Sequence, residues 1–277
     1  MSPGSAWGVF SLQWHPMAHR NLTDQRALVT GASSGIGRAL ALELARRGVD
    51  LVLVARREDL LAEVAGQVSQ LGRRAVIIAG DITDSATRKR ALTAARDELG
   101  GLDILINNAG VAAHGRFVDA SPERLRPIFE LNFFAPVELI RAAIPMLRTG
   151  RQPIIVNVGS ILGERAAPHK TEYSASKFAL HGFSEALRPE LAPLGIDVLT
   201  AVAGPTDTEH FNNLLEDKGG LPWSDPQRKS ADDVAHSIVR AIEQGRHEVV
   251  TSWRSWFWLT LNRIAPRLVD RIMNRYG

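Results

Sequence analysis

The sequence of 277 residues contains no cysteine, and this absence excludes several kinds of site. Disulfide frameworks, thiolate nucleophiles and cysteine-based zinc sites all need thiols. The sequence also lacks any run of about 18 or more apolar residues, so we expect no membrane-spanning helix. Its net charge is only +3 at pH 7, and basic residues are interspersed with acidic ones over most of the chain. This distribution does not indicate nucleic-acid binding.

The apolar content is sufficient for one full hydrophobic core. Apolar residues make up 45% of the sequence and charged residues 23%, which favours a single large domain, predicted to occupy residues 22–251. Residues 1–21 lack a basic leader and a continuous apolar stretch. They are therefore not expected to be a signal peptide, and we interpret them as a flexible arm. The absence of cysteine fits a reducing compartment, and we expect a cytoplasmic protein.

Short apolar runs alternate with helical patterns from residue 26 onward. Strands are predicted at 26–30, 50–55, 75–79, 102–107, 153–159, 197–203 and 247–251. Helices are predicted at 38–47, 58–71, 85–99, 173–192 and 232–244, and a longer helical zone follows Ser121, in which Pro127, Pro136 and Pro145 are expected to cause at least one break. Apolar strands that alternate with helices indicate an α/β fold, a doubly wound parallel sheet covered by helices on both faces.

Tyr173 and Lys177 are four residues apart in a predicted helix, so their side chains lie on one face of one turn. A phenol with a pKa of about 10 is a poor proton shuttle at neutral pH. A nearby ammonium group favours the phenolate, so we expect Lys177 to lower the pKa of Tyr173 and make it a general acid or base. Ser160 would hydrogen-bond the reacting oxygen. By itself, however, this spacing is more typical of an amphipathic surface pair.

A glycine-rich turn connects the first predicted strand to the first predicted helix. Gly31, Gly35 and Gly37 allow a close approach of the backbone, and the N–H groups at the helix start attract an anion such as a pyrophosphate. The spacing G-x-x-x-G-x-G differs from the commonest dinucleotide fingerprint. Taken alone, the turn is equally well interpreted as a tight connection between strand and helix.

Four motifs occur in a fixed order: T-G-A-S-S-G-I-G at Thr30–Gly37, N-N-A-G at Asn107–Gly110, Ser160, and Y-S-A-S-K at Tyr173–Lys177. Together they resemble the short-chain dehydrogenase/reductase family. The resemblance implies a Rossmann-type fold and hydride transfer between a nicotinamide cofactor and a carbonyl or alcohol carbon. It also implies that Ser160 holds the substrate oxygen, that Tyr173 passes the proton, and that Lys177 binds the nicotinamide ribose.

Asn132 completes the catalytic set that this resemblance implies, together with Ser160, Tyr173 and Lys177. In that pattern Asn132 keeps a water molecule in the proton relay. Considered without the resemblance, it is a helical asparagine that bonds to a local carbonyl group.

The residues after the second predicted strand favour NADP(H) as the cofactor. An NAD site generally has an acidic residue there that binds the ribose 2′-OH. In this sequence Ala55 is followed by Arg56 and Arg57, and guanidinium groups suit a 2′-phosphate. The alternative is two solvated arginines at a helix start. Ser34 stands where a common NADP variant of the family has a basic residue, so selectivity is expected to depend mainly on Arg56.

The motifs and the resemblance together predict a cofactor site and no metal site. Asp81 and Ile82 would contact the adenine, although Asp81 also suits the start of a loop. Thr206 and Thr208 would contact the nicotinamide carboxamide, in a segment where Ala203 replaces the family's usual proline. The predicted cofactor residues are Gly31, Ser33, Ser34, Gly35, Ile36, Gly37, Arg56, Arg57, Asp81, Ile82, Asn108, Ala109, Gly110, Tyr173, Lys177, Gly204, Thr206 and Thr208.

Residues 209–229 form a long insertion that we expect to act as a lid over a small-molecule substrate. Its apolar side chains either line a pocket or pack on the domain. Residues 111–117 and 161–170 are expected to form the other walls. Because no basic cluster is dedicated to an anion, we favour a hydrophobic ketone or secondary alcohol over a sugar phosphate.

The C-terminal extension, residues 252–277, is amphipathic. It has five arginines and one aspartate after Thr251, and one helical stripe contains Trp253, Trp256, Phe257, Leu261 and Ile264. Such a helix is too short to span a bilayer but suits its surface, so peripheral membrane contact is one interpretation. The alternatives are packing against a second subunit and covering the substrate entrance.

Two functional classes are compatible with the sequence. The favoured one is an NADP(H)-dependent oxidoreductase, a carbonyl reductase or alcohol dehydrogenase with Tyr173 as its general acid or base. The other is a nucleotide-responsive sensor on the same fold, which would have little need for Ser160, Tyr173 and Lys177. The resemblance further implies a homodimer or homotetramer that associates through the helices containing Asn132 and Tyr173.

Overall fold

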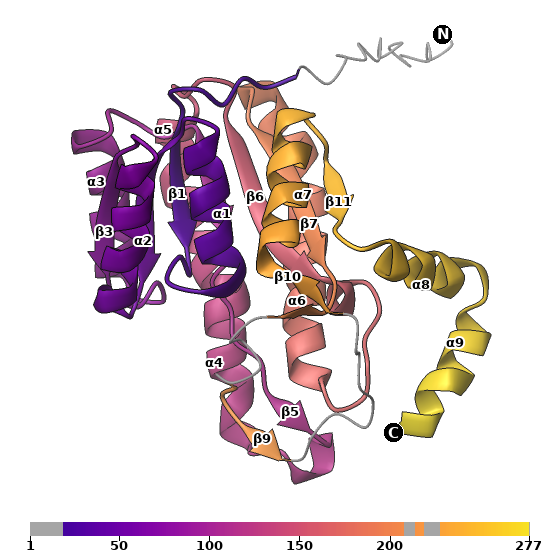
Figure 1. Cartoon of the computed structure of the whole chain (residues 1–277). Coiled ribbons are helices and arrows are strands. Elements are labelled where there is room, and N and C mark those ends of the chain that lie inside the picture. The colour runs from indigo at the N-terminus through magenta and orange to yellow at the C-terminus, as the bar shows by residue number, and fades with distance from the viewer. Residues whose placement is uncertain (1–18, 208–213, 219–227, 277) are drawn as a thin grey trace, which may run out of the picture.

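The computed structural model describes residues 19–207, 214–218 and 228–276 (Figure 1). Seven parallel strands form its central sheet, in the order β11-β7-β6-β4-β1-β2-β3. They are β1 (Arg26–Thr30), β2 (Asp50–Ala55), β3 (Ala75–Ala79), β4 (Ile104–Asn107), β6 (Ile154–Ser160), β7 (Asp197–Ala203) and β11 (Glu248–Val250). The predicted α/β doubly wound fold is confirmed, and every strand boundary lies within two residues of its prediction.

Helices cover both faces of this sheet, because the strands are apolar on both sides. The α-helices are α1 (Gly35–Arg46), α2 (Glu58–Gln70), α3 (Ser85–Asp97), α4 (Leu125–Phe129), α5 (Ala135–Leu147), α6 (Thr171–Leu191), α7 (Ala231–Glu243), α8 (Trp253–Ile264) and α9 (Pro266–Met273). One core cluster joins α1, α2 and α7 to the sheet through side chains such as Leu40, Val64 and Ile238. The other joins α3, α5 and α6 through side chains such as Ala95 and Leu139.

The helical zone after Ser121 is interrupted by a π-helical turn. A 3₁₀ turn at Pro122–Arg124 leads into α4, and the π turn Glu130–Phe134 separates α4 from α5. Pro136 has no N–H group to donate to the carbonyl of Asn132, four residues earlier, so the regular helical ladder cannot continue at this point. A break in the proline-containing zone is thereby confirmed, and it places Asn132 inside a π turn.

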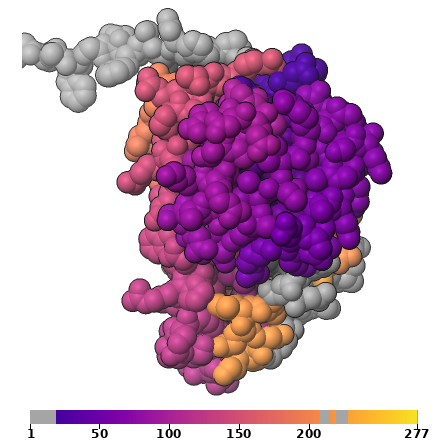
Figure 2. All heavy atoms as spheres, turned by 90° about the vertical axis from the view of Figure 1, so that its left-hand side faces the viewer, coloured from indigo at the N-terminus to yellow at the C-terminus, as the bar shows by residue number. Residues whose placement is uncertain are grey.

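Short strand pairs lie beyond the carboxyl ends of the sheet strands (Figure 1). Strand β5 (His114–Gly115) pairs with β9 (Asp217–Lys218), and β8 (Thr206–Asp207) pairs with β10 (Lys229–Ser230). Figure 2 shows residues of the first half of the chain covering most of one side of the molecule, with the segment around β9 projecting below them. Of the predicted lid, residues 209–213 and 219–227 lie outside the described residues.

The predicted N-terminal arm ends earlier in the chain than residue 21. Arg20 is buried, its backbone N–H donates to Glu243 O at 2.7 Å, and its guanidinium pairs with Asp197. A buried arginine needs such partners, so residue 20 belongs to the domain rather than to a loose arm. Residues 1–18 lie outside the described part of the chain.

The C-terminal extension forms α8 and α9, which lie to one side of the sheet beyond β11 (Figure 1). Ser255, Leu259 and Val269 face the protein and are buried. Trp256 and Ile264, in contrast, are 60% and 79% exposed. Among the described residues, the structure contains no helix with the length and hydropathy that a bilayer crossing requires.

Candidate active site

The carboxyl ends of the central strands open onto a cleft with a volume of about 1370 Å³. In a doubly wound sheet, ligands bind at the edge where neighbouring connections run to opposite faces, and β1, with β2 on one side and β4 on the other, marks that position. Pockets for one small molecule usually measure roughly 300–1,000 Å³. The cleft therefore has room for a dinucleotide and a second molecule.

The predicted site residues converge on this cleft. Every predicted site residue that the structure describes lines it, except Gly37 and Asn132. Thr208 lies outside the described residues. Gly37 stands behind the turn, where an added Cβ would lie 2.1 Å from Gly31 O, so it serves the close packing of helix and strand. Asn132 is fully buried one layer below the cleft surface.

The glycine turn and the N-N-A-G motif support each other directly. Thr30 Oγ1 accepts hydrogen bonds from the backbone N–H groups of Asn108 (3.0 Å) and Ala109 (3.1 Å). The Asn108 side chain donates to Thr30 O at 3.0 Å. Gly31 has a φ of +67°, and a Cβ there would lie 2.9 Å from Asn108 Nδ2. These contacts hold the turn open at the start of α1, as a bound pyrophosphate requires.

Arg57 spans the same turn. Its Nη2 donates to Ser34 Oγ at 2.7 Å and lies 3.4 Å from Ser33 Oγ. Arg57 and the neighbouring Arg56 are both exposed, and both line the cleft. Sequence reasoning emphasised Arg56 and overlooked this contact. The structure therefore brings two guanidinium groups to the end of β2.

The side chain of Asp81 makes a local turn. Its Oδ1 accepts hydrogen bonds from the N–H (2.9 Å) and the hydroxyl (2.8 Å) of Thr83. Both sequence interpretations of Asp81 are thus compatible with its position, because it starts a loop and also lines the cleft beside Ile82.

Ser160, Tyr173 and Lys177 come together from the end of β6 and the first turns of α6. Lys177 Nζ lies 5.9 Å from the centroid of the Tyr173 ring and donates to Val158 O at 2.9 Å. Burial raises the pKa of Tyr173 above its usual value, and the hydrogen bond with Ser160 works in the opposite direction. Burial also lowers the pKa of Lys177 to about 8.

The expected lowering of the Tyr173 pKa is therefore wrong for the protein without ligands. The physical reason is desolvation. Removing water from around a phenolate costs more free energy here than the surrounding groups recover by hydrogen bonding to it. At neutral pH, Tyr173 is a neutral phenol that can donate its proton.

Asn132 connects the π turn to two other segments. Its Oδ1 accepts from Val111 N at 2.8 Å, and its Nδ2 donates to Val111 O and to Ser176 Oγ, both at 2.9 Å. These bonds reach a loop 21 residues away, so the alternative of a purely local carbonyl contact is not what the structure shows. Asn132 thereby fixes the wall after β4 against the helix that carries Tyr173.

A buried polar chain positions the same helix on the sheet. Asn107 Nδ2 donates to Asn157 Oδ1 at 2.9 Å, and Asn157 Nδ2 donates to Ser184 Oγ at 2.8 Å. Among the described residues Asn107 Oδ1 has no hydrogen-bond partner, but the two bonds of Asn157 are both made, and they restrict how α6 can rotate or slide. It therefore holds Tyr173 and Lys177 in register with the end of β6.

A second lysine, which sequence reasoning did not single out, lies beside Tyr173. Lys170 lines the cleft, its Nζ is 5.6 Å from the centroid of the Tyr173 ring, and it contacts His114 Nε2. Burial lowers the pKa of Lys170 to about 8, and burial together with Lys170 lowers that of His114 to about 4. At neutral pH His114 is therefore an uncharged acceptor. The only signal in the sequence was the position of Lys170 in a predicted wall.

The C-terminal extension also lines the cleft. Ser255 packs on the loop after β7, where a Cβ on Gly204 would lie 2.5 Å from its Oγ. Arg263 pairs with Glu164 and Arg165 with Asp270, so two ion pairs join the extension to the wall after β6. The extension residues that line the cleft are Ser252, Trp253, Arg254, Ser255, Phe257, Trp258, Ile272, Met273 and Tyr276. These residues thus form part of the cleft wall, a position that is compatible with the alternative of covering the substrate entrance.

The sequence profile of the family described as "short chain dehydrogenase" matches residues 25–219, well over half of the chain. The chain belongs to the short-chain dehydrogenase/reductase family. It is accordingly an oxidoreductase with the NAD(P) cofactor typical of that family.

Other members of this family resemble the chain over most of its length. The "11-beta-hydroxysteroid dehydrogenase-like 4A" of Arabidopsis thaliana is 39% identical over 248 residues, which cover 87% of this chain and 81% of the relative. A short-chain dehydrogenase of Burkholderia cenocepacia in complex with NADP is 32% identical, with a TM-score of 0.74 over 83% of this chain and 97% of that one.

A further solved family member shows the shared fold. The enzyme of Burkholderia phymatum, in complex with NAD, has a TM-score of 0.81 over 90% of this chain and 96% of that one, at 24% identity. Because solved family members are complexed with either nicotinamide cofactor, the choice between NAD and NADP depends on residues of this chain.

Proposed function

We propose that this short-chain dehydrogenase/reductase is an NADP(H)-dependent carbonyl reductase that acts on a hydrophobic ketone or, in reverse, on a secondary alcohol. The observation that carries the proposal is the convergence of Ser160, Tyr173 and Lys177 in one cleft with the glycine turn. A sensor that only binds a nucleotide needs the turn but has no use for a partly buried phenol beside a hydroxyl and an amine.

The residues present fit the cofactor. The glycine turn lines the cleft through Gly31 and Gly35, and the start of α1 supplies N–H groups for the pyrophosphate. Arg56 and Arg57 would bind the 2′-phosphate, and Lys177 would bind the nicotinamide ribose. Gly110 lines the cleft next to this lysine, and a Cβ there would lie 3.6 Å from Lys177 Nζ. When bound, the reduced cofactor supplies the hydride for the carbonyl carbon.

The protein's own groups manage the charge that develops on the substrate oxygen. Ser160 donates a hydrogen bond to this oxygen and orients it toward Tyr173. The Tyr173 hydroxyl then gives its proton to the oxygen as the carbonyl is reduced. A raised pKa keeps Tyr173 protonated at neutral pH, which suits the reductive direction. In the oxidative direction the phenolate would accept the proton from the alcohol.

The walls of the cleft support an apolar substrate. Phe257, Trp258, Ile272 and Met273 of the extension line it, and Leu215 faces it from the insertion. Such walls favour a steroid-like or acyl substrate over a sugar phosphate, because apolar surface is buried on binding. The relationship to a protein named as hydroxysteroid dehydrogenase-like supports the same substrate class.

We further propose that the outer face of α8 and α9 rests on an anionic membrane surface. Trp256 and Ile264 are largely exposed, and neither lines the cleft. Arginine beside aromatic residues on a short amphipathic helix is typical of interfacial binding. A hydrophobic substrate could then enter the cleft from the lipid along the inner face of the same helices.

The subunits of a homodimer or homotetramer would meet at a different surface. Phe134, in the π turn before α5, and Phe178, on α6, are both about half exposed. Both residues lie on the helical segments that contain Asn132 and Tyr173, through which the family resemblance implies that subunits associate. Burying such aromatic groups would favour a contact between copies of the chain.

A substrate screen tests the central proposal. Purified protein with NADPH and a panel of steroid, acyl and small aliphatic ketones should lose NADPH absorbance, and fastest with the hydrophobic members. Turnover that is restricted to sugar phosphates would refute the substrate class, and a complete lack of turnover with tight NADPH binding would favour the sensor.

A further inference from the structure

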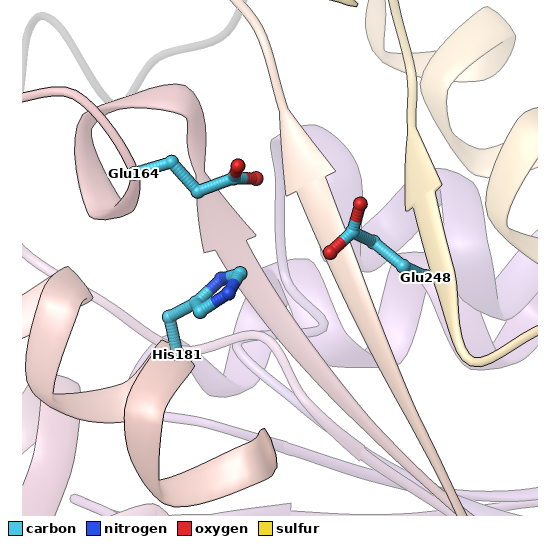
Figure 3. A group of neighbouring side chains, drawn as sticks. All are labelled: Glu164, His181 and Glu248. Atoms are coloured by element: carbon cyan, nitrogen blue, oxygen red, sulfur yellow. The ribbon is translucent and has the colours of Figure 1, made fainter. Parts of the chain in front are cut away.

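Three side chains from distant parts of the chain meet behind the catalytic helix. Glu164 follows the 3₁₀ turn after β6, His181 lies on α6, and Glu248 begins β11 (Figure 3). One ligand atom from each, two carboxylate oxygens and an imidazole nitrogen, lies within 4.8 Å of the others. In Figure 3 the carboxylate of Glu164 points toward the space between the other two groups.

Glu164 is the unusual member of this group. Its side chain is only 8% exposed, and its Oε2 accepts a hydrogen bond from Arg263 Nη2 at 2.8 Å. Its Oε1 is buried and has no hydrogen-bond partner among the described residues. A buried carboxylate oxygen without a donor is costly. Burial and the charge of Glu248 accordingly raise the pKa of Glu164.

We infer that Glu164, His181 and Glu248 form a binding site for one divalent transition-metal ion, with Zn²⁺ the best fit. Imidazole nitrogen combined with carboxylate oxygen suits Zn²⁺ better than the all-oxygen environment that Mg²⁺ and Ca²⁺ prefer. The ion would take the unpartnered Oε1 of Glu164, and water would complete the coordination. Nothing in the sequence suggested this site, and the motifs and the family resemblance predicted no metal. The inference therefore departs from that prediction.

Arg263 supports this arrangement instead of competing with it. It occupies Oε2 of Glu164 and leaves Oε1 available, so it can orient the carboxylate as groups behind metal ligands commonly do. Two carboxylates beside one guanidinium leave an excess negative charge, which a divalent ion would neutralise.

The position of the site gives the ion a structural role. Glu164 lies four residues after Ser160, and His181 lies four residues after Lys177, one turn further along the same helix. An ion held by both would tie the Ser160 loop to α6 from behind, while Glu248 adds the edge strand β11. We expect a bound ion to stabilise this junction and to leave the hydride-transfer chemistry to the cleft.

Calorimetric titration of untagged, EDTA-treated protein with ZnCl₂ tests the inference. We expect one Zn²⁺ per chain and an increase in Tm with Zn²⁺ that MgCl₂ at the same concentration does not reproduce. Glu164→Gln, His181→Gln and Glu248→Gln should each weaken Zn²⁺ binding about tenfold or more. Melting curves without metal, recorded for each variant, show whether it is folded.

Glu185→Gln is the matched control. Glu185 Oε1 lies 3.6 Å from His181 Nε2, and the Glu185 side chain is 62% exposed, so it is a nearby carboxylate outside the proposed site. The Glu185→Gln variant should bind Zn²⁺ as tightly as the wild type does. No Zn²⁺ binding by the wild type, or binding that a folded Glu164→Gln or Glu248→Gln variant retains in full, would overturn the site. Loss of binding in Glu185→Gln alone would assign the ion to a surface pair instead.

Discussion

Lys177 Nζ lies over the ring of Tyr173, 5.9 Å from its centroid, and its hydrogen bond goes to the carbonyl of Val158. The amine is thus held by the end of β6, and α6 carries both residues. Enclosure of the pair makes the charged form of each group unfavourable, which raises the pKa of the phenol and lowers that of the amine. The phenol therefore stays protonated at neutral pH, as the proton-donor role that we propose for Tyr173 requires.

Removing the phenolic hydroxyl should separate chemistry from binding. For Tyr173→Phe we expect kcat to fall by about 10²–10⁴-fold, because the general acid is lost, and the Kd for NADPH to change by less than about threefold. Single-turnover kinetics and fluorescence titration measure the two quantities. Tyr276→Phe removes the only other tyrosine hydroxyl, which also lines the cleft, and should cost far less. Equal losses in both variants would contradict the role of Tyr173.

Cofactor preference should depend on the two arginines after β2. Arg56→Ala should weaken NADPH binding by about 10–100-fold, the loss of one or two charge-assisted hydrogen bonds, and should leave NADH binding nearly unchanged. Arg57→Ala should act in the same direction, and it also releases Ser34. Titration of each variant with both cofactors gives the comparison. A similar loss of affinity for NADPH and NADH would show that the arginines do not read the 2′-phosphate.

Stability should depend on pH through Lys177. Its pKa is about 8 in the folded protein, against 10.5 as the ordinary value. Between these values the unfolded chain binds the proton and the folded protein does not, so the free energy of unfolding contributed by Lys177 rises with pH. Below pH 8 the full cost of burying the charge is present.

Lys177→Met removes this titration and keeps a side chain of similar length. Relative to the variant, the wild type should therefore gain about 1–3 kcal/mol in free energy of unfolding between pH 8 and pH 10.5. Lys170, with a similar pKa, titrates in both proteins and cancels from the comparison. Urea denaturation at a series of pH values measures the difference. If the difference in free energy of unfolding between the two proteins stays constant with pH, the pKa of Lys177 is not lowered in the folded protein.

Membrane contact should depend on the outer face of the extension. The double variant Trp256→Ser/Ile264→Ser should lose flotation with vesicles that contain anionic lipid, and it should keep its affinity for NADPH because neither residue lines the cleft. Leu71→Ser alters an exposed apolar residue at the end of α2 and should float as the wild type does. If the double variant instead changes the molar mass in solution and flotation is absent throughout, the face is a contact between subunits.

The order and approximate bounds of the helices and strands could be predicted from the sequence because they depend on local patterns. Apolar runs of strand length, glycine at Gly31 and Gly35, and the i, i+4 pair Tyr173–Lys177 act within a few residues of each other. The parallel sheet then brings the ends of β1, β4 and β6 to one edge, so most of the predicted cofactor and catalytic residues line one cleft. Even the break at Asn132 follows from a nearby proline.

Tertiary structure alone decided the features that depend on distant partners. The direction of the Tyr173 pKa required knowledge of how completely the site is enclosed, and desolvation is a property of the whole surroundings. Arg57 reaches Ser34 from 23 residues away. The group of Glu164, His181 and Glu248 forms only because the fold brings the turn after β6, helix α6 and the start of β11 together. Likewise, the apolar pattern of α8 could not show which residues face the protein. Periodicity defines the faces of a helix, but packing determines which face is buried.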